Sequence, residues 1–221
     1  MKRTIVIAVA GTGHRLDATS PKCMIKINGY YIFEYLLRAF EKFDEIRMVT
    51  GYNSDMVVEA VSAVRKDIVF INNEAYSQSS APLQSFFLGS IGLIGKVLYS
   101  VGDTIYSRNS AATLFRECSG EDEFVTITPK TSENPIYASM HNDSSLVQLS
   151  RSVVSESEFA GAAYIDCSKV INKQSYFFEQ LNHYMPLKTI SIDRLEVDTR
   201  SDLAFAEKIV SQNPEQYDFW R

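Results

Sequence analysis

The sequence predicts an α/β fold built on a Rossmann-like, doubly wound sheet that is mixed but mainly parallel. Residues 4–9 form a continuous apolar run, helical stripes alternate with short β-branched runs after it, and glycine or acidic residues directly follow two of the expected strands. A strand that is apolar without alternation is typical of a parallel sheet covered on both faces. Neighbouring parallel strands need crossover connections, and the intervening helices supply them.

The first half of the chain alternates regularly between the two kinds of element. Apolar residues recur at helical spacing between short runs of strand composition. The glycines of the third helical segment weaken that prediction. We expect strands over residues 4–9, 46–49, 68–71 and 97–101, and helices over residues 32–40, 54–64 and 83–93.

The second half is less regular. Asn142-Asp143 is a turn signal inside a segment that alternates like a pair of antiparallel strands. Neither a repeat nor a low-complexity linker divides the chain, so we expect residues 1–221 to form a single domain. We expect strands over residues 124–128, 159–165 and 188–192, antiparallel strands between 136 and 154, and helices over residues 109–116, 176–184 and 202–210.

Composition excludes several classes of protein. The 221 residues carry a formal net charge of −5, with scattered rather than clustered Lys and Arg, which argues against a nucleic-acid partner. The three cysteines lack metal-binding spacing and are odd in number, as expected for a reducing cytosol. No apolar stretch approaches the roughly 20 residues needed to span a bilayer, so we expect a soluble, cytoplasmic protein without a membrane partner.

The segment from Ala8 to Lys22 follows the first strand and is the most informative in the chain. Its glycines lack bulk where backbone passes close to a ligand, and backbone amides of such segments donate to phosphate oxygens. Arg15 and Lys22 add two cations, and Pro21 restricts the backbone beside Lys22. The segment therefore predicts a triphosphate site. Its expected nucleotide-binding residues are Ala8, Ala10, Gly11, Thr12 and Gly13.

Two other glycine-rich motifs do not fit this segment. A dinucleotide fingerprint would need glycine at position 16, which is Leu16, and the GxxxxGK[ST] motif is absent. These residues alone also allow an alternative to a triphosphate site. In this alternative, Gly11 and Gly13 form the turn that leaves the strand, and Arg15 and Lys22 are solvated.

Gly102-Asp103 directly follows the expected strand over 97–101. The carboxyl ends of parallel strands meet at one edge of the sheet, where ligands bind. We therefore expect Asp103 to face the segment from Ala8 to Lys22, although an aspartate at a strand end is also a common turn residue.

The motif A-G-T-G-H-R-L, followed by P-K and then N-G-Y-Y-I-F-E-Y-L, resembles the signature of the GT-A-type nucleotidyltransferase superfamily. This superfamily includes sugar-phosphate nucleotidyltransferases, bacterial phosphocholine cytidylyltransferases and methylerythritol-phosphate cytidylyltransferases. The resemblance implies a GT-A-like nucleotidyltransferase fold. It also implies that Arg15 and Lys22 are catalytic groups that bind the nucleotide phosphates.

Weaker matches continue to the end of the chain. They imply that Asp103, and Asp198 within Val-Asp-Thr, hold one Mg²⁺, which prefers carboxylate and phosphate oxygens. From its position alone, Asp198 is better explained as a carboxylate at the start of the last helix than as a metal ligand. Lys130 and Arg151 are loop cations within reach of an acceptor phosphate, and Lys130 is taken for that role. The resemblance further implies nucleotide contacts from Asn73, Ser80, Ser85 and Gly102, and an acceptor contact from Gly161.

The implied activity is transfer of a nucleotidyl group from an NTP to a small phosphorylated acceptor, with release of pyrophosphate. Only five residues separate Arg15 from Pro21, which resembles the cytidylyltransferases and favours CTP. The alternatives are a sugar-1-phosphate nucleotidyltransferase that uses UTP or another NTP, and a catalytically inactive nucleotide-binding paralogue. The resemblance implies a role in capsule or surface polysaccharide biosynthesis. The aromatic tail 213–221 is expected to pack either on the domain itself or on a second subunit of a homodimer.

Overall fold

A computed structural model of the chain describes residues 2–12, 16, 20–78, 81–141 and 145–220. Within these residues, nine strands form one sheet and four short strands form two small sheets. In sheet order, the path is β10 (Leu146–Ser150), β9 (Tyr137–Met140), β11 (Ser157–Asp166), β6 (Lys96–Val101), β1 (Thr4–Ala8), β4 (Glu45–Thr50) and β5 (Ile68–Asn72). Off this path, β8 (Phe124–Pro129) pairs with β11 and with β12 (Lys188–Ser191).

The strands from the first half of the sequence form the parallel part of the sheet. β1 pairs in parallel with both β4 and β6, and β4 pairs in parallel with β5. Beyond β6 the sheet becomes mixed, because β11 runs antiparallel to β6, β8 and β9. The predicted α/β class with a mixed, Rossmann-like sheet is confirmed.

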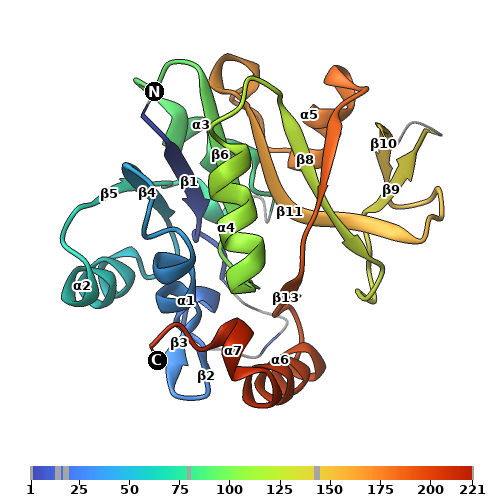
Figure 1. Cartoon of the computed structure of the whole chain (residues 1–221). Helices are drawn as coiled ribbons and strands as arrows, with labels where there is room; N and C mark the ends of the chain where they lie inside the picture. The colour runs from blue at the N-terminus through green and yellow to red at the C-terminus, as the bar shows by residue number, and fades with distance from the viewer. Residues whose placement is uncertain (1, 13–15, 17–19, 79–80, 142–144, 221) are drawn as a thin grey trace.

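Helices cover both faces of the sheet, as Figure 1 shows. The apolar core on one face takes side chains from α1 (Ile32–Ala39), α2 (Ser54–Val64), α4 (Arg108–Glu117), α6 (Arg200–Gln212) and α7 (Pro214–Tyr217). The core on the other face takes them from α3 (Leu83–Ser90) and α5 (Phe177–Leu181). Because both faces are covered, apolar side chains are favoured on both faces of the central strands.

The first strand shows this arrangement directly. Ile5 and Ile7 belong to one apolar cluster, Val6 belongs to the other, and all three are fully buried. Consecutive side chains of a strand point to opposite faces, so an unbroken apolar run fills both cores. The non-alternating pattern at residues 4–9 therefore reflects a strand that is buried on both faces, as the sequence predicts.

Two helices end earlier than the apolar spacing predicts. α3 ends at Ser90 rather than near residue 93, because Ile91 leaves the helical region and Gly92 has φ +78°. α5 covers only Phe177–Leu181, and residues 182–184 continue as a 3₁₀ turn. Periodicity alone does not separate a helix from the tighter turn that extends it.

The smaller sheets bring the later chain to the carboxyl end of β6. β2 (Lys26–Ile27) pairs with β3 (Tyr30–Tyr31), and β7 (Thr104–Tyr106) pairs with β13 (Arg194–Glu196). The second pairing joins Glu196 to Thr104, and the Val197 amide donates to the Asp103 carbonyl at 2.9 Å. Residues 194–198 therefore lie beside Asp103, although some 90 positions separate them in the chain.

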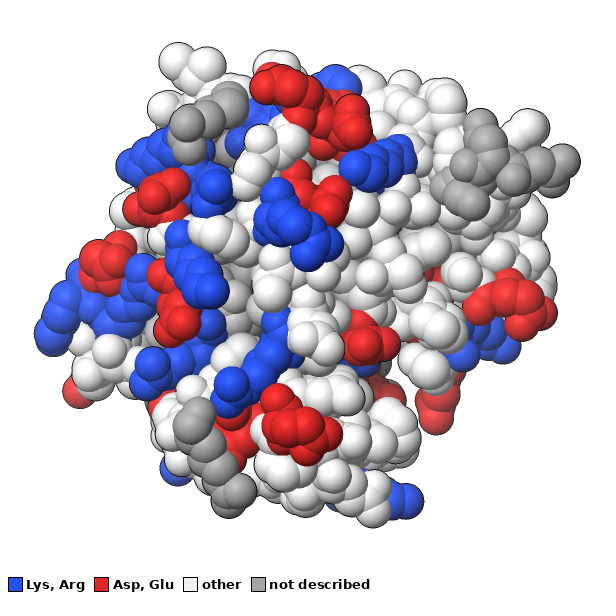
Figure 2. Space-filling view, in the orientation of Figure 1, with Lys and Arg blue, Asp and Glu red and all other residues white. Residues whose placement is uncertain are grey.

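Charged side chains of both signs are interspersed on the face drawn in Figure 2. A broad surface of one sign is the usual footprint of a nucleic-acid-binding protein, and this face lacks one. Every helix within the described residues is too short or too polar to cross a membrane.

Gly102 is required by close packing at the end of β6. A Cβ atom at this position would lie 2.4 Å from Val9 Cγ1 and 2.6 Å from the Ala8 carbonyl oxygen. We expect Gly102→Ala to lower the free energy of unfolding by about 1–3 kcal/mol, because backbone must shift to admit the methyl group. Urea denaturation followed by circular dichroism measures this change.

Gly11 provides the matched control. It lies after β1, and a Cβ atom there would meet nothing within 4 Å. Gly11→Ala is expected to change the free energy of unfolding by less than about 0.5 kcal/mol. Equal losses in the two variants would contradict the packing explanation.

Candidate functional site

Lys22 lies between two carboxylates that come from distant parts of the chain. A 3₁₀ turn over Lys22–Met24 follows Pro21 and presents the Lys22 ammonium, whose Nζ lies 3.0 Å from Asp103 Oδ2. The same Nζ donates to Asp198 Oδ1. Asp103 follows β6 and Asp198 follows β13, so three separate segments meet here. The predicted meeting of the Ala8 to Lys22 segment with Asp103 is confirmed.

The three charges are partly buried and strongly coupled. Burial by itself would lower the pKa of Lys22, but the Asp103 and Asp198 carboxylates together raise it above its ordinary value. Burial by itself would raise the pKa of Asp103, and the Lys22 ammonium holds it below its usual range. Lys22 is therefore a cation and Asp103 an anion at neutral pH.

Glu196 joins this cluster, although the sequence did not predict it. Single carboxylate oxygens of Asp103, Glu196 and Asp198 all lie within 4.8 Å of one another. Burial, together with the nearby charges of Asp103 and Asp198, raises the pKa of Glu196. The missed signal was the Glu-x-Asp spacing, because residues two apart in an extended segment face the same side.

The carboxylate cluster fits a hard divalent cation. Its three donors are carboxylates, the ligands that Mg²⁺ and similar ions prefer. Asp103 Oδ1 is buried and has no hydrogen-bond partner within the described part of the chain. A buried carboxylate oxygen without a partner is costly, and coordination to a cation would remove that cost.

The alternative role of Asp198 as a helix cap does not hold. The N-cap of α6 is Thr199, whose side chain accepts from the Asp202 amide. Asp202 completes the capping box by accepting from the amides of Thr199 and Asp198. The Asp198 side chain is instead directed to Lys22.

A cleft opens beside the carboxylates and extends toward α5. Its lining includes all three acidic residues and the buried Arg194. Arg194 Nη1 lies 2.5 Å from Glu196 Oε2, and Nη2 lies 3.4 Å from Glu158 Oε1. The Glu158 side chain is fully buried and also accepts from Thr131 and Ser132. Arg194 therefore links Glu196 to Glu158 of the central sheet through ion pairs.

The cleft is lined by Pro82, Val101, Asp103, Ser132, Asn134, Pro135, Ile136, Arg151, Phe159, Gly161, Tyr176, Phe177, Phe178, Arg194, Glu196 and Asp198.

The two loop cations considered for the acceptor lie in different places. Both side chains are exposed, but only Arg151 lines the cleft, whereas the Lys130 Nζ lies 5.9 Å from the centre of the Tyr137 ring. Gly161 lines the cleft at an irregularity in the pairing of β11 with β8, and its contact with an acceptor stays a prediction. Its φ of +83° is unfavourable for other residues, and a Cβ atom would lie 2.8 Å from Val101 Cγ2. The acceptor role of Lys130 stays a prediction.

Several predicted nucleotide-binding residues lie around the ends of β1 and β6. Ala8 ends β1, Ala10 is buried and accepts from the Tyr52 amide, and Gly11 is exposed. Thr12 lies next to it, and Gly102 precedes Asp103. Their position at one edge agrees with the prediction, and their contacts to nucleotide stay a prediction. Gly13, Arg15 and Ser80 lie outside the described residues.

Asn73 and Ser85 contact each other. Both are buried, and Asn73 Nδ2 donates to Ser85 Oγ at 3.0 Å. Asn73 Oδ1 also accepts from the Ala75 amide at 3.1 Å. These side chains fasten the turn after β5 to α3. Their contact with a nucleotide is untested and stays a prediction.

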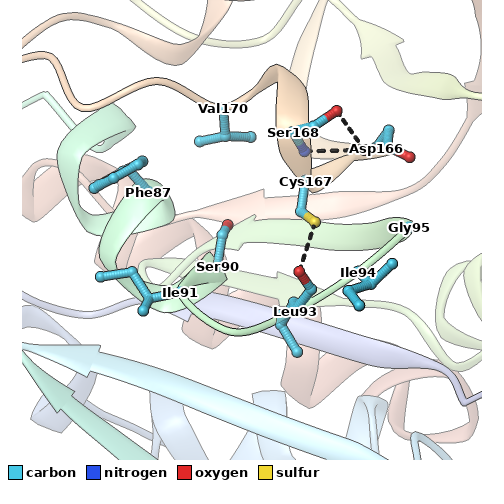
Figure 3. Close-up of a pocket in the computed structure, with 10 residues that line it drawn as sticks. All are labelled: Phe87, Ser90, Ile91, Leu93, Ile94, Gly95, Asp166, Cys167, Ser168 and Val170. Carbon is cyan, nitrogen blue, oxygen red and sulfur yellow. Dashed lines mark hydrogen bonds between the residues drawn. The ribbon is translucent and has the colours of Figure 1, made fainter.

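A second pocket lies at the other end of β6, away from the carboxylates. Figure 3 shows it between the end of α3, the turn at Gly95 and residues 166–170. Its lining is mostly apolar, and Cys167 Sγ donates to the Leu93 carbonyl at 3.4 Å. The pocket brings together no group of titratable side chains like that around Lys22.

The three cysteines are free, so no disulfide links them. Burial raises the pKa of the Cys23 thiol to about 12 and that of Cys118 further still. Burial and the Asp166 carboxylate also raise the pKa of Cys167, which is only partly buried.

Alkylation of the native protein is therefore expected to be slow at pH 7 and to start at Cys167. The thiolate is the reactive form, and a raised pKa lowers its fraction at any pH below that pKa. The rate at Cys167 should rise as pH increases above 8. Mass spectrometry after timed iodoacetamide treatment measures it, with urea-unfolded protein as the reference. Faster labelling of Cys23 than of Cys167 in the native protein would contradict the burial of Cys23.

No family model matches the chain, and no curated protein sequence matches it at a significant level. Solved structures do match in fold. A Bacillus anthracis protein assigned as a glucose-1-phosphate thymidylyltransferase, in complex with sucrose, has a TM-score of 0.81 at 13% identity, over 95% of each chain. The CTP:phosphocholine cytidylyltransferase of Streptococcus pneumoniae has a TM-score of 0.75 at 14% identity, over 95% of this chain and 100% of its own. The inositol-1-phosphate CTP transferase of T. maritima has a TM-score of 0.74 at 18% identity, over 97% of each chain.

The chain therefore has the fold of these nucleotidyltransferases. The resemblance that the sequence indicates is confirmed at the level of the fold. Two of these three structures are described as enzymes that use CTP and the third as a thymidylyltransferase, so the fold is shared by proteins with different nucleotides.

Proposed function

We propose that this protein is a nucleotidyltransferase that transfers a nucleotidyl group from an NTP to a small phosphorylated acceptor. CTP is the first candidate for the NTP. One observation carries the proposal: Lys22 and three carboxylates converge at the carboxyl edge of the parallel strands, beside a cleft lined by two arginines. Negatively charged phosphates are stabilised by cations, and carboxylates can hold a metal ion that phosphate oxygens also coordinate. The fold of known nucleotidyltransferases supports the same conclusion.

In the proposed reaction, an oxygen of the acceptor phosphate attacks the α-phosphorus of the NTP in line. The new P–O bond forms as the bond to the β-phosphate bridging oxygen breaks, and pyrophosphate leaves. Asp103, Glu196 and Asp198 are the proposed holders of a Mg²⁺ ion, which supplies charge neutralisation at the α-phosphate when bound. The proposed role of Lys22, and of Arg15 in the loop, is to stabilise negative charge on the phosphates. The reaction needs no protein nucleophile.

The choice of CTP rests on two observations. Arg15 and Pro21 are separated by only five residues, and two of the three structures compared above are described with CTP. A sugar-1-phosphate acceptor with UTP or dTTP is the second candidate, because the Bacillus anthracis protein is assigned as a glucose-1-phosphate thymidylyltransferase. We further propose that residues 1–221 act as one catalytic domain in the cytoplasm, in the activation of a building block for a surface polysaccharide.

Pyrophosphate release tests the proposal. The full chain is incubated with Mg²⁺, each common NTP and a panel of phosphorylated alcohols, amino alcohols, amino acids and sugars. We expect release with one NTP and one class of acceptor, and none when EDTA is added. Absence of release with every pair, while NTP binding is measurable, would identify a nucleotide-binding paralogue instead.

A further inference from the structure

Arg151 is held at the wall of the cleft by three contacts. It directly follows β10, and the carbon of its guanidinium lies 5.1 Å from the centre of the Tyr176 ring and 5.7 Å from that of Phe178. Its Nη1 donates to the Asn134 carbonyl at 3.2 Å. A guanidinium that stacks on aromatic rings is preorganised and keeps further N–H donors for a ligand.

Within the part of the chain that the structure describes, Arg151 forms no ion pair with a carboxylate, whereas Arg194 in the same cleft is paired with Glu196 and Glu158. Arg151 is therefore a cationic group of the cleft without an ion-pair partner among the described acidic residues. Such a group favours an anionic ligand.

Arg151 and the three carboxylates line the same cleft. One short segment of chain contacts both, because Ser132 Oγ lies 3.3 Å from Glu196 Oε2 and, two residues later, the Asn134 carbonyl accepts from Arg151. A ligand whose phosphate lies beside the carboxylates and whose other end extends along the cleft therefore approaches Arg151.

The rings of Tyr176 and Phe178 are not arranged to take a quaternary ammonium. Such a ligand binds against open aromatic faces. Tyr176 and Phe178 instead have the Arg151 guanidinium above their rings, and a second cation there would be repelled.

We propose that Arg151 determines acceptor specificity by binding a second anionic group, a carboxylate or a further phosphate, on the acceptor. The inference rests on the proposed function, because it takes the cleft beside the carboxylates as the acceptor site. It excludes phosphocholine as the preferred acceptor. The acceptor is a phosphate ester that is anionic at both ends.

Matched acceptors test this assignment. Glucose 1-phosphate is compared with glucuronic acid 1-phosphate and glucose 1,6-bisphosphate, and glycerol 3-phosphate with 3-phosphoglycerate. Phosphocholine is the cationic member. Binding to the full chain is measured by isothermal titration calorimetry with Mg²⁺, with and without α,β-methylene CTP, and kcat/KM by pyrophosphate release. Comparison of glucuronic acid 1-phosphate with glucose 1,6-bisphosphate shows whether a carboxylate or a second phosphate is the preferred anionic group.

We expect the anionic member of at least one scaffold to bind roughly tenfold or more tightly than its neutral counterpart, the scale of a charge-assisted hydrogen bond. Arg151→Gln should abolish this preference, and Arg151→Glu should reverse it. Arg116→Gln is the control, because Arg116 is an exposed arginine of α4 outside the cleft. Thermal melts establish that the variants are folded.

Two results would overturn the inference. An equal loss for every acceptor in Arg151→Gln would place Arg151 on the common phosphate, and tighter binding of neutral or cationic members by the unaltered protein would exclude an anionic specificity. Calorimetric preference for anionic members without pyrophosphate release under any condition would instead reject the proposed reaction and leave the specificity of the cleft standing.

Discussion

Replacing Asp103 by alanine is expected to lower the turnover of nucleotidyl transfer roughly 10²- to 10³-fold or more, the scale for losing a preorganised electrostatic group. Asp103 contributes one oxygen to the ion pair with Lys22 and has a second, buried oxygen without a partner among the described residues. Its loss removes a carboxylate from the proposed metal site and leaves the Lys22 ammonium with one partner fewer.

Steady-state pyrophosphate release measures the effect, and titration with a fluorescent NTP analogue separates turnover from binding. Asp103→Asn tests the charge at nearly constant shape and should show most of the same loss. Asp122→Ala is the control, because the Asp122 side chain is 73% exposed and pairs with Lys188 at the opposite edge of the sheet. Unchanged turnover in Asp103→Ala with NTP binding intact would contradict the mechanism.

Replacing Lys22 by alanine is expected to lower turnover by a similar factor, roughly 10² to 10³, because a cation is lost where pyrophosphate develops charge. The variant should also bind a metal more tightly when nucleotide is absent. The Lys22 ammonium contacts Asp103 and Asp198 and thereby competes for the carboxylates of the proposed metal site. A several-fold to roughly tenfold gain in affinity is expected for a partly exposed pair of this kind.

Electron paramagnetic resonance of Mn²⁺ with the nucleotide-free protein measures this gain independently of activity. Lys22→Met retains the apolar part of the side chain and should show the same gain without extra loss of stability. Lys188→Ala, at the opposite edge of the sheet, should leave Mn²⁺ binding unchanged. Weaker Mn²⁺ binding in both Lys22 variants would show that the ammonium does not oppose the metal.

Much of the fold follows from local patterns. The non-alternating run at residues 4–9 becomes a doubly covered strand, and the alternating strands and helices of the first half become the parallel part of the sheet. Helix ends were predicted less well, because Gly92 and the 3₁₀ turn after α5 are local deviations that apolar spacing does not record.

The candidate site was predicted in part. Lys22 and Asp103 were placed at one edge because parallel strands present their carboxyl ends together. Glu196 was missed, because a single acidic residue in a strand is usually a solvated side chain. Only the pairing of β13 with β7 shows that it faces Asp103.

The sequence by itself therefore determined the class of fold, the edge of the sheet that carries the site, and three of its charged groups: Lys22, Asp103 and, through the family resemblance, Asp198. The fold class and the edge of the sheet follow from the hydrophobic period and from the order of strands and helices, and both are patterns along consecutive residues. The tertiary structure decided which polar side chains are free to act. It directs Asp198 to Lys22 because Thr199 caps α6, fastens Asn73 to Ser85, and places Arg151 rather than Lys130 in the cleft. A polar group either binds a ligand or satisfies its neighbours, and only the positions of those neighbours distinguish the two.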